Sequence, residues 1–374
     1  MAIYFDNSAT TKPCDEAVAA VKKAVSESYG NPSSLHFLGI RAHDDLEKAR
    51  RDISEALGCR FDCLYFAPSG TYANNAAIFG VWNRLKKEGN TIVTTALEHP
   101  SVLEPLKKLK ESFGVNIVYL YPDKNGNIDK DELYSVINQD TILVSMMAVN
   151  NETGLILPVS EIRGAVKRAK APAVIHSDCV QAFGKIRSSP DFLKADLMSI
   201  SSHKIHGPKG AGALYVNDKK KLKPQIFGGG QENGMFPGTE STPAILGFSA
   251  AAKALPDIEQ ELSYIASLKK RLISQLKDCD KIVINSPENS IAYIINLSVL
   301  TMKSQPLVGY LSDKGICVSA GSACKKGKRS STLVAMGLKP SVIDSAIRIS
   351  FSRFNKECEV DALANELLNL AKRI

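Results

Sequence analysis

Short apolar runs alternate with longer amphipathic stretches along the first two thirds of the chain. The runs have the length of strands and are rich in β-branched residues, whereas apolar residues recur at helical spacing in the stretches between them. The strand-like runs are residues 63–67, 91–95, 116–120, 141–145 with a continuation to 149, 173–177, 196–201 and 212–216. This alternation predicts an α/β fold in which helices cover both faces of a mostly parallel sheet.

The pattern changes after residue 216. A glycine-rich polar segment, residues 228–239, is too irregular for a helix or strand and indicates a functional or interface loop. Helices over 243–254 and 259–276, followed by strands near 291–297, 316–319 and 346–350, predict a smaller α+β domain. We therefore expect a large domain over residues 13–254 and a small domain made of residues 1–12 and 255–374.

Composition narrows the class of protein. Of the 374 residues, 44% are hydrophobic and 23% are charged, which are ordinary globular values. The chain lacks an apolar run of the roughly 18 residues that a membrane span needs, and its start lacks the pattern of a signal peptide. We therefore expect a soluble, cytoplasmic protein without membrane attachment.

Cysteine spacing and charge bear on metals and partners. The eight cysteines are scattered and none forms a Cys-x-x-Cys pair, which favours free thiols in a reducing compartment and argues against a metal site. The net charge is +8, but the basic residues are mostly spread along predicted helices. The basic cluster at 219–223 has no interleaved aromatic residues to stack on bases, so we expect no nucleic-acid partner.

Polar residues follow the strand-like runs repeatedly, at the point where each run ends. In open sheets of parallel strands, ligands bind beyond the carboxyl ends of the strands. The polar ends therefore predict a binding site, formed by residues 70–71, 98–99, 150–152, 178–181 and 201–204.

Lys204 lies in a polar turn between two apolar runs. A lysine held at a strand end can lose its proton and form a Schiff base with an aldehyde, although the same pattern is consistent with a solvated loop lysine. Gly70 and Thr71 stand at a strand-to-helix turn, where backbone N–H groups and the helix dipole favour a phosphate. An ordinary helix cap explains that turn equally well.

Asp178 and His99 also follow strand-like runs. A carboxylate in such a position can hold a pyridinium nitrogen protonated, so that the ring accepts electrons, or it can cap a helix. The histidine ring can stack on a planar cofactor and move protons near neutral pH, or it can be a surface residue.

Two residues of the C-terminal part carry further chemistry. Cys324 lies in a segment of small residues that we expect to be exposed and mobile, and the cations that follow it favour the thiolate. It is also consistent with an incidental loop cysteine. Arg348 lies within a strand-like run, where a charge needs an anionic partner: a substrate carboxylate or a structural Asp or Glu.

Taken in order and spacing, the motifs of this chain resemble those of cysteine desulfurases of the NifS/IscS type. These belong to the class V aminotransferase branch of fold-type I enzymes that use pyridoxal 5′-phosphate (PLP). The resemblance covers nearly the whole chain and rests on DNSATT (residues 6–11), YGNPSS (29–34), EH (98–99), VNNETG (149–154), HKIHGPKG (203–210), GGGQE (228–232), GSAC (321–324) and IRIS (347–350).

The resemblance implies a role for each matching residue. Lys204 would bind PLP covalently and Cys324 would accept the sulfur. The other cofactor contacts implied are Asp178 on the ring nitrogen, Gln181 near the ring hydroxyl, His99 on the ring face, and Gly70, Thr71, Ser201 and His203 at the phosphate, joined by Thr239 of the partner subunit. The substrate carboxylate would be bound by Arg348 and Asn151, with Asn31 close by.

The implied reaction is the conversion of L-cysteine to L-alanine, with Cys324 carrying the sulfur as a persulfide. The resemblance further implies a homodimer with shared active sites, and a sulfur-acceptor or scaffold protein such as those of iron–sulfur cluster biosynthesis. Two alternatives stay open from the sequence. One is a selenocysteine lyase or another class V lyase or aminotransferase, which need not use Cys324. The other is a sulfur-relay component that turns over only with a partner.

The chain also departs from the family pattern in several places. Tyr72 stands where the family usually has an acidic residue, Ser202 where it usually has glycine, and Phe236-Pro237 where an arginine is common. The segment after Cys324 is slightly short and unusually basic. These departures bear on the phosphate site and on partner recognition, and they leave Lys204 and Asp178 in place.

Overall fold

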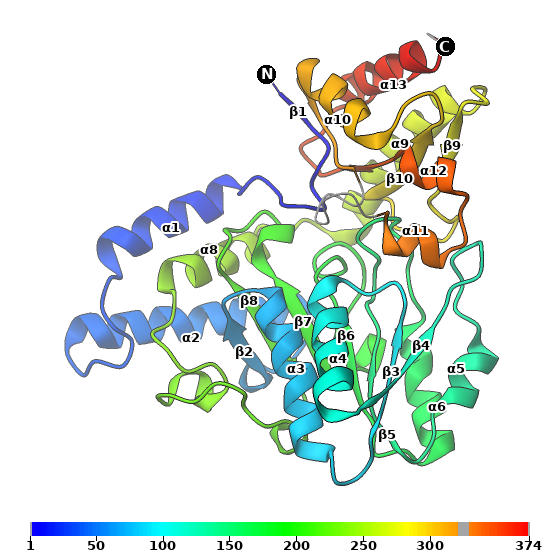
Figure 1. Cartoon of the computed structure of the whole chain (residues 1–374). Coiled ribbons are helices and arrows are strands. Elements are labelled where there is room, and N and C mark those ends of the chain that lie inside the picture. Colours follow the sequence, from blue (N-terminus) through cyan, green and yellow to red (C-terminus); the bar gives the residue numbers. More distant parts are fainter. Residues whose placement is uncertain (1, 321–328, 373–374) are drawn as a thin grey trace.

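The computed structural model describes residues 2–320 and 329–372 (Figure 1). The strands are β1 (Ile3–Tyr4), β2 (Leu64–Ala67), β3 (Thr91–Thr95), β4 (Asn116–Leu120), β5 (Thr141–Ser145), β6 (Val174–Asp178), β7 (Leu197–Ser201), β8 (Gly212–Val216), β9 (Ile282–Ile284), β10 (Ile294–Val299), β11 (Ile316–Cys317) and β12 (Ala346–Ser350).

The α-helices and short 3₁₀ turns connect these strands. The helices are α1 (Asp15–Glu27), α2 (Phe37–Leu57), α3 (Gly70–Leu85), α4 (Pro100–Phe113), α5 (Lys130–Val136), α6 (Ile162–Ala169), α7 (Pro190–Leu193), α8 (Thr242–Lys253), α9 (Ile258–Leu276), α10 (Ser304–Asp313), α11 (Ser331–Ala335), α12 (Pro340–Asp344) and α13 (Glu357–Lys372). The 3₁₀ turns are η1 (Phe61–Cys63), η2 (Val159–Glu161), η3 (Ser202–Lys204), η4 (Lys219–Lys221) and η5 (Gln231–Gly234).

The central sheet confirms the expected α/β fold. Its strand order is β2-β8-β7-β6-β5-β3-β4, and every neighbouring pair is parallel except the two pairs that involve β8. Strands β3, β5, β6, β7 and β8 are buried at every position because helices cover both faces of the sheet. Helix α3 lies across β5 to β8, with α4 beside it (Figure 1).

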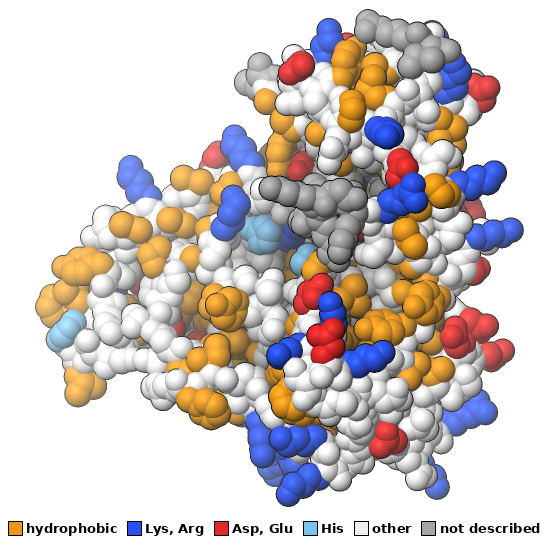
Figure 2. Space-filling model, in the orientation of Figure 1, with side chains coloured by type: hydrophobic (Ala, Val, Ile, Leu, Met, Phe, Trp, Pro, Cys, Tyr) orange, Lys and Arg blue, Asp and Glu red, His pale blue; other side chains and the backbone are white. Residues whose placement is uncertain are grey.

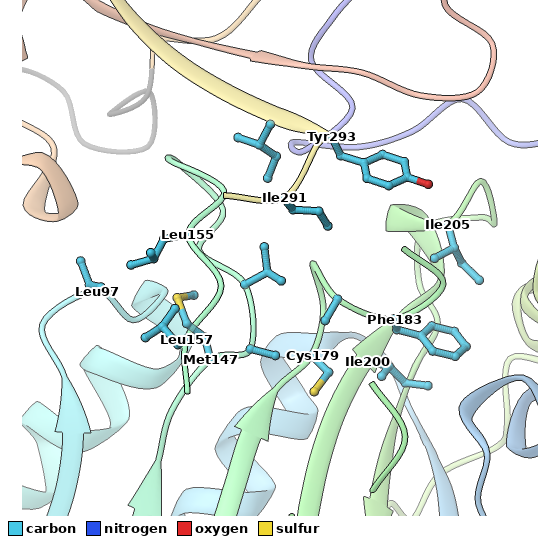
Figure 3. Packing of buried hydrophobic residues seen from close by; sticks show 14 of the residues in the cluster. Leu97, Met147, Leu155, Leu157, Cys179, Phe183, Ile200, Ile205, Ile291 and Tyr293 are labelled. Atoms are coloured by element: carbon cyan, nitrogen blue, oxygen red, sulfur yellow. The ribbon is translucent and has the colours of Figure 1, made fainter. Parts of the chain in front are cut away.

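The expected strand limits hold closely, with two informative differences. Strands β3, β4, β8 and β12 begin and end where the sequence predicts. However, β5 ends at Ser145 rather than running on to residue 149, and β10 begins at Ile294 rather than 291. The apolar side chains of Met147 and Ile291 are buried in the core beyond the strand ends, so their hydrophobicity reflects packing and not strand pairing (Figure 3).

The C-terminal part forms a smaller α+β unit. Strands β12, β10 and β9 make an antiparallel sheet, and helices α9 and α13 pack against each other within this part of the chain. The N-terminal strand β1 pairs in parallel with β11, so the first residues lie with the C-terminal ones (Figure 1). The domain limits at residues 12/13 and 254/255 stay a prediction.

One hydrophobic cluster joins the two parts of the molecule. It contains Ile200 and Phe183 beneath the central sheet edge, Leu155 from the loop after β5, and Ile291 from the segment before β10 (Figure 3). Because this cluster continues from the sheet into the C-terminal part, residues of the C-terminal part pack beside the carboxyl ends of the strands.

The glycine-rich segment is anchored by a buried ion pair. Arg50 of α2 donates from both terminal nitrogens to Glu232, at 2.7 and 2.8 Å, and Glu232 also accepts from the backbone N–H of Phe66 at 2.7 Å. The arginine makes a second ion pair of 3.0 Å with the more exposed Glu47. Both glutamates therefore bind the same guanidinium, but only Glu232 is fully enclosed.

Within the described ranges, 2–320 and 329–372, the structure has no helix long and apolar enough to cross a membrane.

We predict that Glu232→Ala costs about 3–5 kcal/mol of stability, because it leaves the Arg50 charge buried without its main partner. The matched control is Glu47→Ala, which removes the exposed partner of the same arginine and should cost about 0–1 kcal/mol. Urea unfolding of the cofactor-free protein, followed by circular dichroism, measures both. Equal midpoints for the two variants would contradict the assignment of Glu232 as the anchor.

Candidate active site

A cavity of about 470 Å³ lies at the carboxyl ends of the central strands, facing the C-terminal part. It is the place where the sequence predicts a site. The predicted residues that line it are Gly70, Thr71, His99, Asn151, Asp178, Gln181, Ser201, His203, Lys204 and Arg348.

Lys204 stands at the end of β7, in the 3₁₀ turn η3. Its amine donates hydrogen bonds to the backbone carbonyls of Ser8 and Ala9, the latter at 2.8 Å. Both acceptors belong to the N-terminal arm, residues 6–11, whose DNSATT motif received no separate role from the sequence. The arm is tied in turn to η3, because the hydroxyl of Thr11 donates to the carbonyl of His203 at 3.0 Å.

Asp178 is the last residue of β6 and is buried. One carboxylate oxygen accepts from the backbone N–H of Val180 at 3.0 Å, and the other accepts from the amide of Asn74 at 2.7 Å. The same Asn74 amide donates to the hydroxyl of Ser101 at 2.8 Å. Ser101 in turn contacts His99, so one chain of hydrogen bonds runs from the aspartate to the histidine.

The contacts of His99 fix its tautomer. Its Nδ1 accepts from the backbone N–H of Ser101 at 3.1 Å and lies 2.7 Å from the Ser101 hydroxyl. A nitrogen that accepts a hydrogen bond carries no proton, so Nε2 carries the proton of the neutral ring. Burial lowers the pKa of His99, and Lys204 lowers it further against the opposing effect of Asp178. The ring is therefore neutral at pH 7.

One part of the cavity wall is suited to a phosphate. Gly70 and Thr71 begin helix α3, whose backbone N–H groups and dipole favour an anion. A Cβ on Gly70 would lie 2.8 Å from the side chain of Val180, so glycine is needed for this close approach. The Ser201 hydroxyl on the same wall is buried and has no hydrogen-bond partner among the described residues. An orphaned hydroxyl beside a helix N-terminus fits the phosphate that the sequence predicts here.

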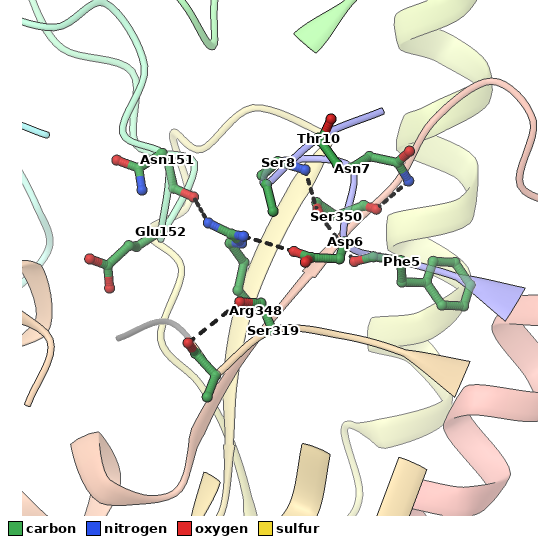
Figure 4. Close-up of polar contacts among 12 residues, drawn as sticks. Phe5, Asp6, Asn7, Ser8, Thr10, Asn151, Glu152, Ser319, Arg348 and Ser350 are labelled. Carbon is green, nitrogen blue, oxygen red and sulfur yellow. Dashed lines mark hydrogen bonds and ion pairs between the residues drawn. The ribbon is translucent and has the colours of Figure 1, made fainter. Parts of the chain in front are cut away.

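Arg348 has the structural partner that the sequence left as an alternative. Its guanidinium donates to the carboxylate of Asp6 at 2.8 Å and to the carbonyl of Asn151 at 2.9 Å (Figure 4). However, the Nε of Arg348 is buried and has no hydrogen-bond partner among the described residues. The arginine is thus held in place by the protein, with one of its donors left unpaired among the described residues.

Cys324 lies outside the described residues. Ser319, before it in the chain, lines the cavity, as do Arg329, Ser330 and Thr332 after it. Ser330 is fixed by a hydrogen bond of 2.5 Å to Glu152, which also lines the cavity. The described residues on both sides of Cys324 therefore reach the cavity.

Two predicted residues do not line this cavity. Asn31 lies in the loop before α2, where its side chain accepts from the N–H of Ser33, and Thr239 lies beyond η5. The single chain does not bring either to Lys204. Their roles stay predictions, and for Thr239 the prediction is a contact with the other subunit.

The departures from the family pattern have definite surroundings. The extra hydroxyl of Ser202 fits because Gly207 has no side chain: a Cβ there would lie 2.1 Å from it. Tyr72 and Phe236 line one apolar hollow together, next to Thr71. Residues that stand where charges are common in the family therefore line the same hollow.

Sequence reasoning gave no role to several residues that shape the site. Asn74 and Ser101 connect Asp178 to His99, and Asp6 holds Arg348. Glu98 is enclosed by hydrogen bonds from Thr95 and from the backbone of Met147, and burial raises its pKa to about 8. The only sequence signal for Asn74 is its position four residues after Gly70, on the same face of α3.

Comparison with known proteins gives a consistent result. The family model described as aminotransferase class-V matches residues 3–363. The chain is 39% identical over 366 residues to a NifS/IcsS protein homolog of Lactobacillus delbrueckii subsp. bulgaricus, covering 96% of this chain and 94% of that one. It is 35% identical over 377 residues to the cysteine desulfurase IscS of Methanosarcina thermophila, covering 100% and 93% of the two chains.

Solved structures agree with these relatives. A NifS-like protein superposes with a TM-score of 0.94 at 34% identity, covering 100% of both chains. A structure described as SspA in complex with cysteine superposes with a TM-score of 0.83 at 30% identity, covering 95% of this chain and 100% of the other.

The buried histidines predict acid sensitivity. Burial lowers the pKa values of His176, His203 and His206 to about 4, from an ordinary value of 6.5. The unfolded chain therefore binds more protons than the folded one between these pH values. The folded protein loses stability through these three histidines as the pH falls from 6.5 to about 4. Glu98 acts oppositely, because its folded pKa of about 8 favours proton uptake in the native state.

The contribution of one histidine can be isolated with His206→Gln. Glutamine can still donate to the Lys12 carbonyl, which lies 2.9 Å from His206 Nδ1, but it does not take up a proton in this range. We predict that the cofactor-free variant loses less stability than the wild type between pH 6.5 and 4.5, as measured by urea midpoints. Parallel curves for the two proteins would contradict the depressed pKa of His206.

Proposed function

The chain belongs to the class V aminotransferase family and, within it, to the NifS/IscS-type cysteine desulfurases, and on this premise we propose that it converts L-cysteine to L-alanine and transfers the sulfur to Cys324. The observation that carries the proposal is the meeting in one cavity of the Lys204 amine, the buried carboxylate of Asp178 and the guanidinium of Arg348. These groups fit a PLP site with an amino-acid subsite beside it.

The cofactor that fits this cavity is PLP, which when bound supplies an aldehyde for amines and a ring that absorbs electrons. Lys204 carries the cofactor, and Asp178 keeps a proton on the ring nitrogen. Asn74 and the Val180 N–H hold that carboxylate in one orientation. Gly70, Thr71, Ser201 and His203 bind the phosphate, with the unpartnered hydroxyl of Ser201 gaining an acceptor.

The same cavity binds and deprotonates the substrate. Arg348 binds the cysteine carboxylate together with Asn151, since both line the cavity. The Lys204 amine, once the substrate amine has taken its place on the cofactor, would take the proton from the substrate Cα. His99 is neutral with its proton on Nε2, so this nitrogen donates a hydrogen bond and does not accept a proton in this tautomer.

The sulfur transfer is a displacement at the substrate sulfur. The Cys324 thiolate attacks that sulfur, an S–S bond forms, and the C–S bond of the substrate breaks. The electron pair of the broken bond stays with the carbon, which takes up a proton and leaves as alanine. Cysteine and the enzyme thiol thus give alanine and an enzyme persulfide, so no external oxidant is needed.

We further propose a homodimer in which Thr239 of one subunit completes the phosphate site of the other. Large apolar side chains are exposed on the lobe formed by α1 and α2 and near η5, including Leu35 at 94%, Phe37 at 77% and Phe227 at 90% (Figure 2). Such a concentration is typical of a protein interface. The apolar hollow lined by Tyr72 and Phe236 lies beside Thr71. We propose that side chains of the other subunit pack into it.

A reducing, cytoplasmic location and a protein acceptor for the sulfur complete the proposal. The described cysteines, which are Cys14, Cys59, Cys63, Cys179, Cys279, Cys317 and Cys358, are all free thiols. This favours a reducing compartment. The basic segment after Cys324 favours an acidic acceptor or scaffold protein, as in iron–sulfur cluster assembly.

We predict that Cys324→Ala abolishes sulfide release from cysteine in the presence of a thiol reductant, with at least a hundredfold loss in kcat, while the protein stays yellow with PLP. Lys204→Ala is the control that should lose the covalently bound cofactor as well as activity. Assays of sulfide and alanine, with absorption spectra, measure both. A Cys324→Ala variant as fast as the wild type would favour a lyase mechanism that does not use this thiol. Wild-type activity that appears only with an added partner would favour the relay alternative.

The dimer prediction is tested by hybrids of Lys204→Ala and Thr239→Ala subunits. If Thr239 acts across the interface, a hybrid dimer has one doubly altered site and one intact site, and it should regain about half of the wild-type activity per dimer. If Thr239 acts within its own subunit, the hybrid has no intact site. Two different affinity tags isolate the hybrid, and Thr239→Ala homodimers, which should bind PLP several-fold more weakly, are the reference.

A further inference from the structure

Lys185 is a second buried lysine behind the cavity, to which the proposed mechanism gives no role. It follows β6 by a turn in which Gly184 has a φ of 71°. A side chain on Gly184 would also collide with Leu255, at 2.9 Å. Glycine therefore favours the turn that brings Lys185 back to Gln181.

The hydrogen bonds of Gln181 are fixed from both sides. The Lys185 amine donates to Gln181 Oε1 at 2.9 Å, and Gln181 Nε2 donates to the Ser8 carbonyl at 2.9 Å. A carbonyl only accepts, so the amide cannot turn over without facing Ser8 with its own oxygen. The NH₂ group of Gln181 thus has one hydrogen bound to Ser8 and a second one left for the cavity, which Gln181 lines.

Stability does not account for an amine in this place. Burial lowers the pKa of Lys185 to about 7, with Lys204 and Arg348 lowering it further and Glu261 opposing them. The ring of Tyr293 lies 5.7 Å from the amine, and the cavity beside it, about 10 Å³, is at the lower limit for one water. Removing an ammonium group from water costs free energy, and apolar residues of similar size are often more stable there.

We propose that Lys185 is a positioning residue of the cofactor site, which holds the Gln181 carboxamide so that it presents an N–H, and not a carbonyl oxygen, to the ring of the bound cofactor. This inference rests on the proposed function, since it concerns the ring that Asp178 and Lys204 would hold. An N–H donor stabilises a negatively charged ring oxygen, whereas an amide carbonyl would repel it. Without Lys185, Gln181 Oε1 would be buried without a partner, and only the bond to Ser8 would hold the amide.

The test is a double-mutant cycle on cofactor binding. Lys185→Met, Gln181→Met and the double variant are prepared without cofactor and titrated with PLP by absorbance. We expect each single variant to bind PLP about 5- to 30-fold more weakly, as loss of one hydrogen bond implies, and its yellow band to shift in wavelength. Because Lys185 acts through Gln181, the double variant should match Gln181→Met within about twofold.

Lys269→Met is the matched control. Lys269 is another enclosed lysine, whose pKa burial lowers to about 8, but its amine bonds to Ser290 and the Ile291 carbonyl and does not line the cavity. This variant should keep the wild-type PLP affinity and spectrum. If Lys185→Met does not fold, as judged by circular dichroism, Lys185→Leu, which likewise has no N–H donor for Gln181, takes its place in the cycle.

Two results would overturn the inference. One is a Lys185 variant with wild-type PLP affinity and spectrum, and the other is losses that add in the double variant, which would mean that Lys185 acts independently of Gln181. Neither result touches the proposed function, which fails separately if the wild-type protein itself forms no yellow complex with PLP.

Discussion

The backbone carbonyl of Ser8 accepts hydrogen bonds from Lys204 and Gln181, and the orientation of the whole site depends on it. The strands of the central sheet bring polar side chains to one edge, but strand ends do not determine where long side chains point. A fixed acceptor such as the Ser8 carbonyl determines that direction, because a side chain that donates to it must point towards it. The arm that carries Ser8 is itself held on both sides, by the bond of Asp6 to Arg348 of β12 and by the bond of Thr11 to His203 of η3.

Burial sets the charge state of the groups around this acceptor. It favours the neutral forms of His99 and His203, and it lowers the pKa of Lys185 to about 7. The charges that remain have defined partners: Asn74 binds Asp178, and Asp6 binds Arg348. The cavity thus has few charges of its own, and each is oriented before a charged ligand arrives, which reduces the reorganisation that catalysis would require.

Sequence patterns predicted the sheet, most strand limits and the residues that meet at its edge. These depend on local periodicity and on the rule that strand ends converge, so Lys204 and Asp178 could be placed without a structure. Contacts between distant segments were not predictable in this way. The partner of Arg348 is Asp6, 342 residues away in the chain, and the polar arm gave no sign of it. Likewise, the hydrophobicity of residues 146–149 and 291–293 is the same whether they pair in a strand or only pack in the core, so the sequence could not distinguish the two.

The arm has a consequence for biosynthesis. Asn7 donates to the carbonyl of Ser350, 343 residues later, so the arm reaches its final position only after the ribosome has made β12. A chain that ends before β12 has neither the Ser350 carbonyl nor Arg348, so the arm that carries the Ser8 carbonyl is held only from the side of η3. Full ordering of the acceptor for Lys204 and Gln181 therefore depends on completion of the polypeptide.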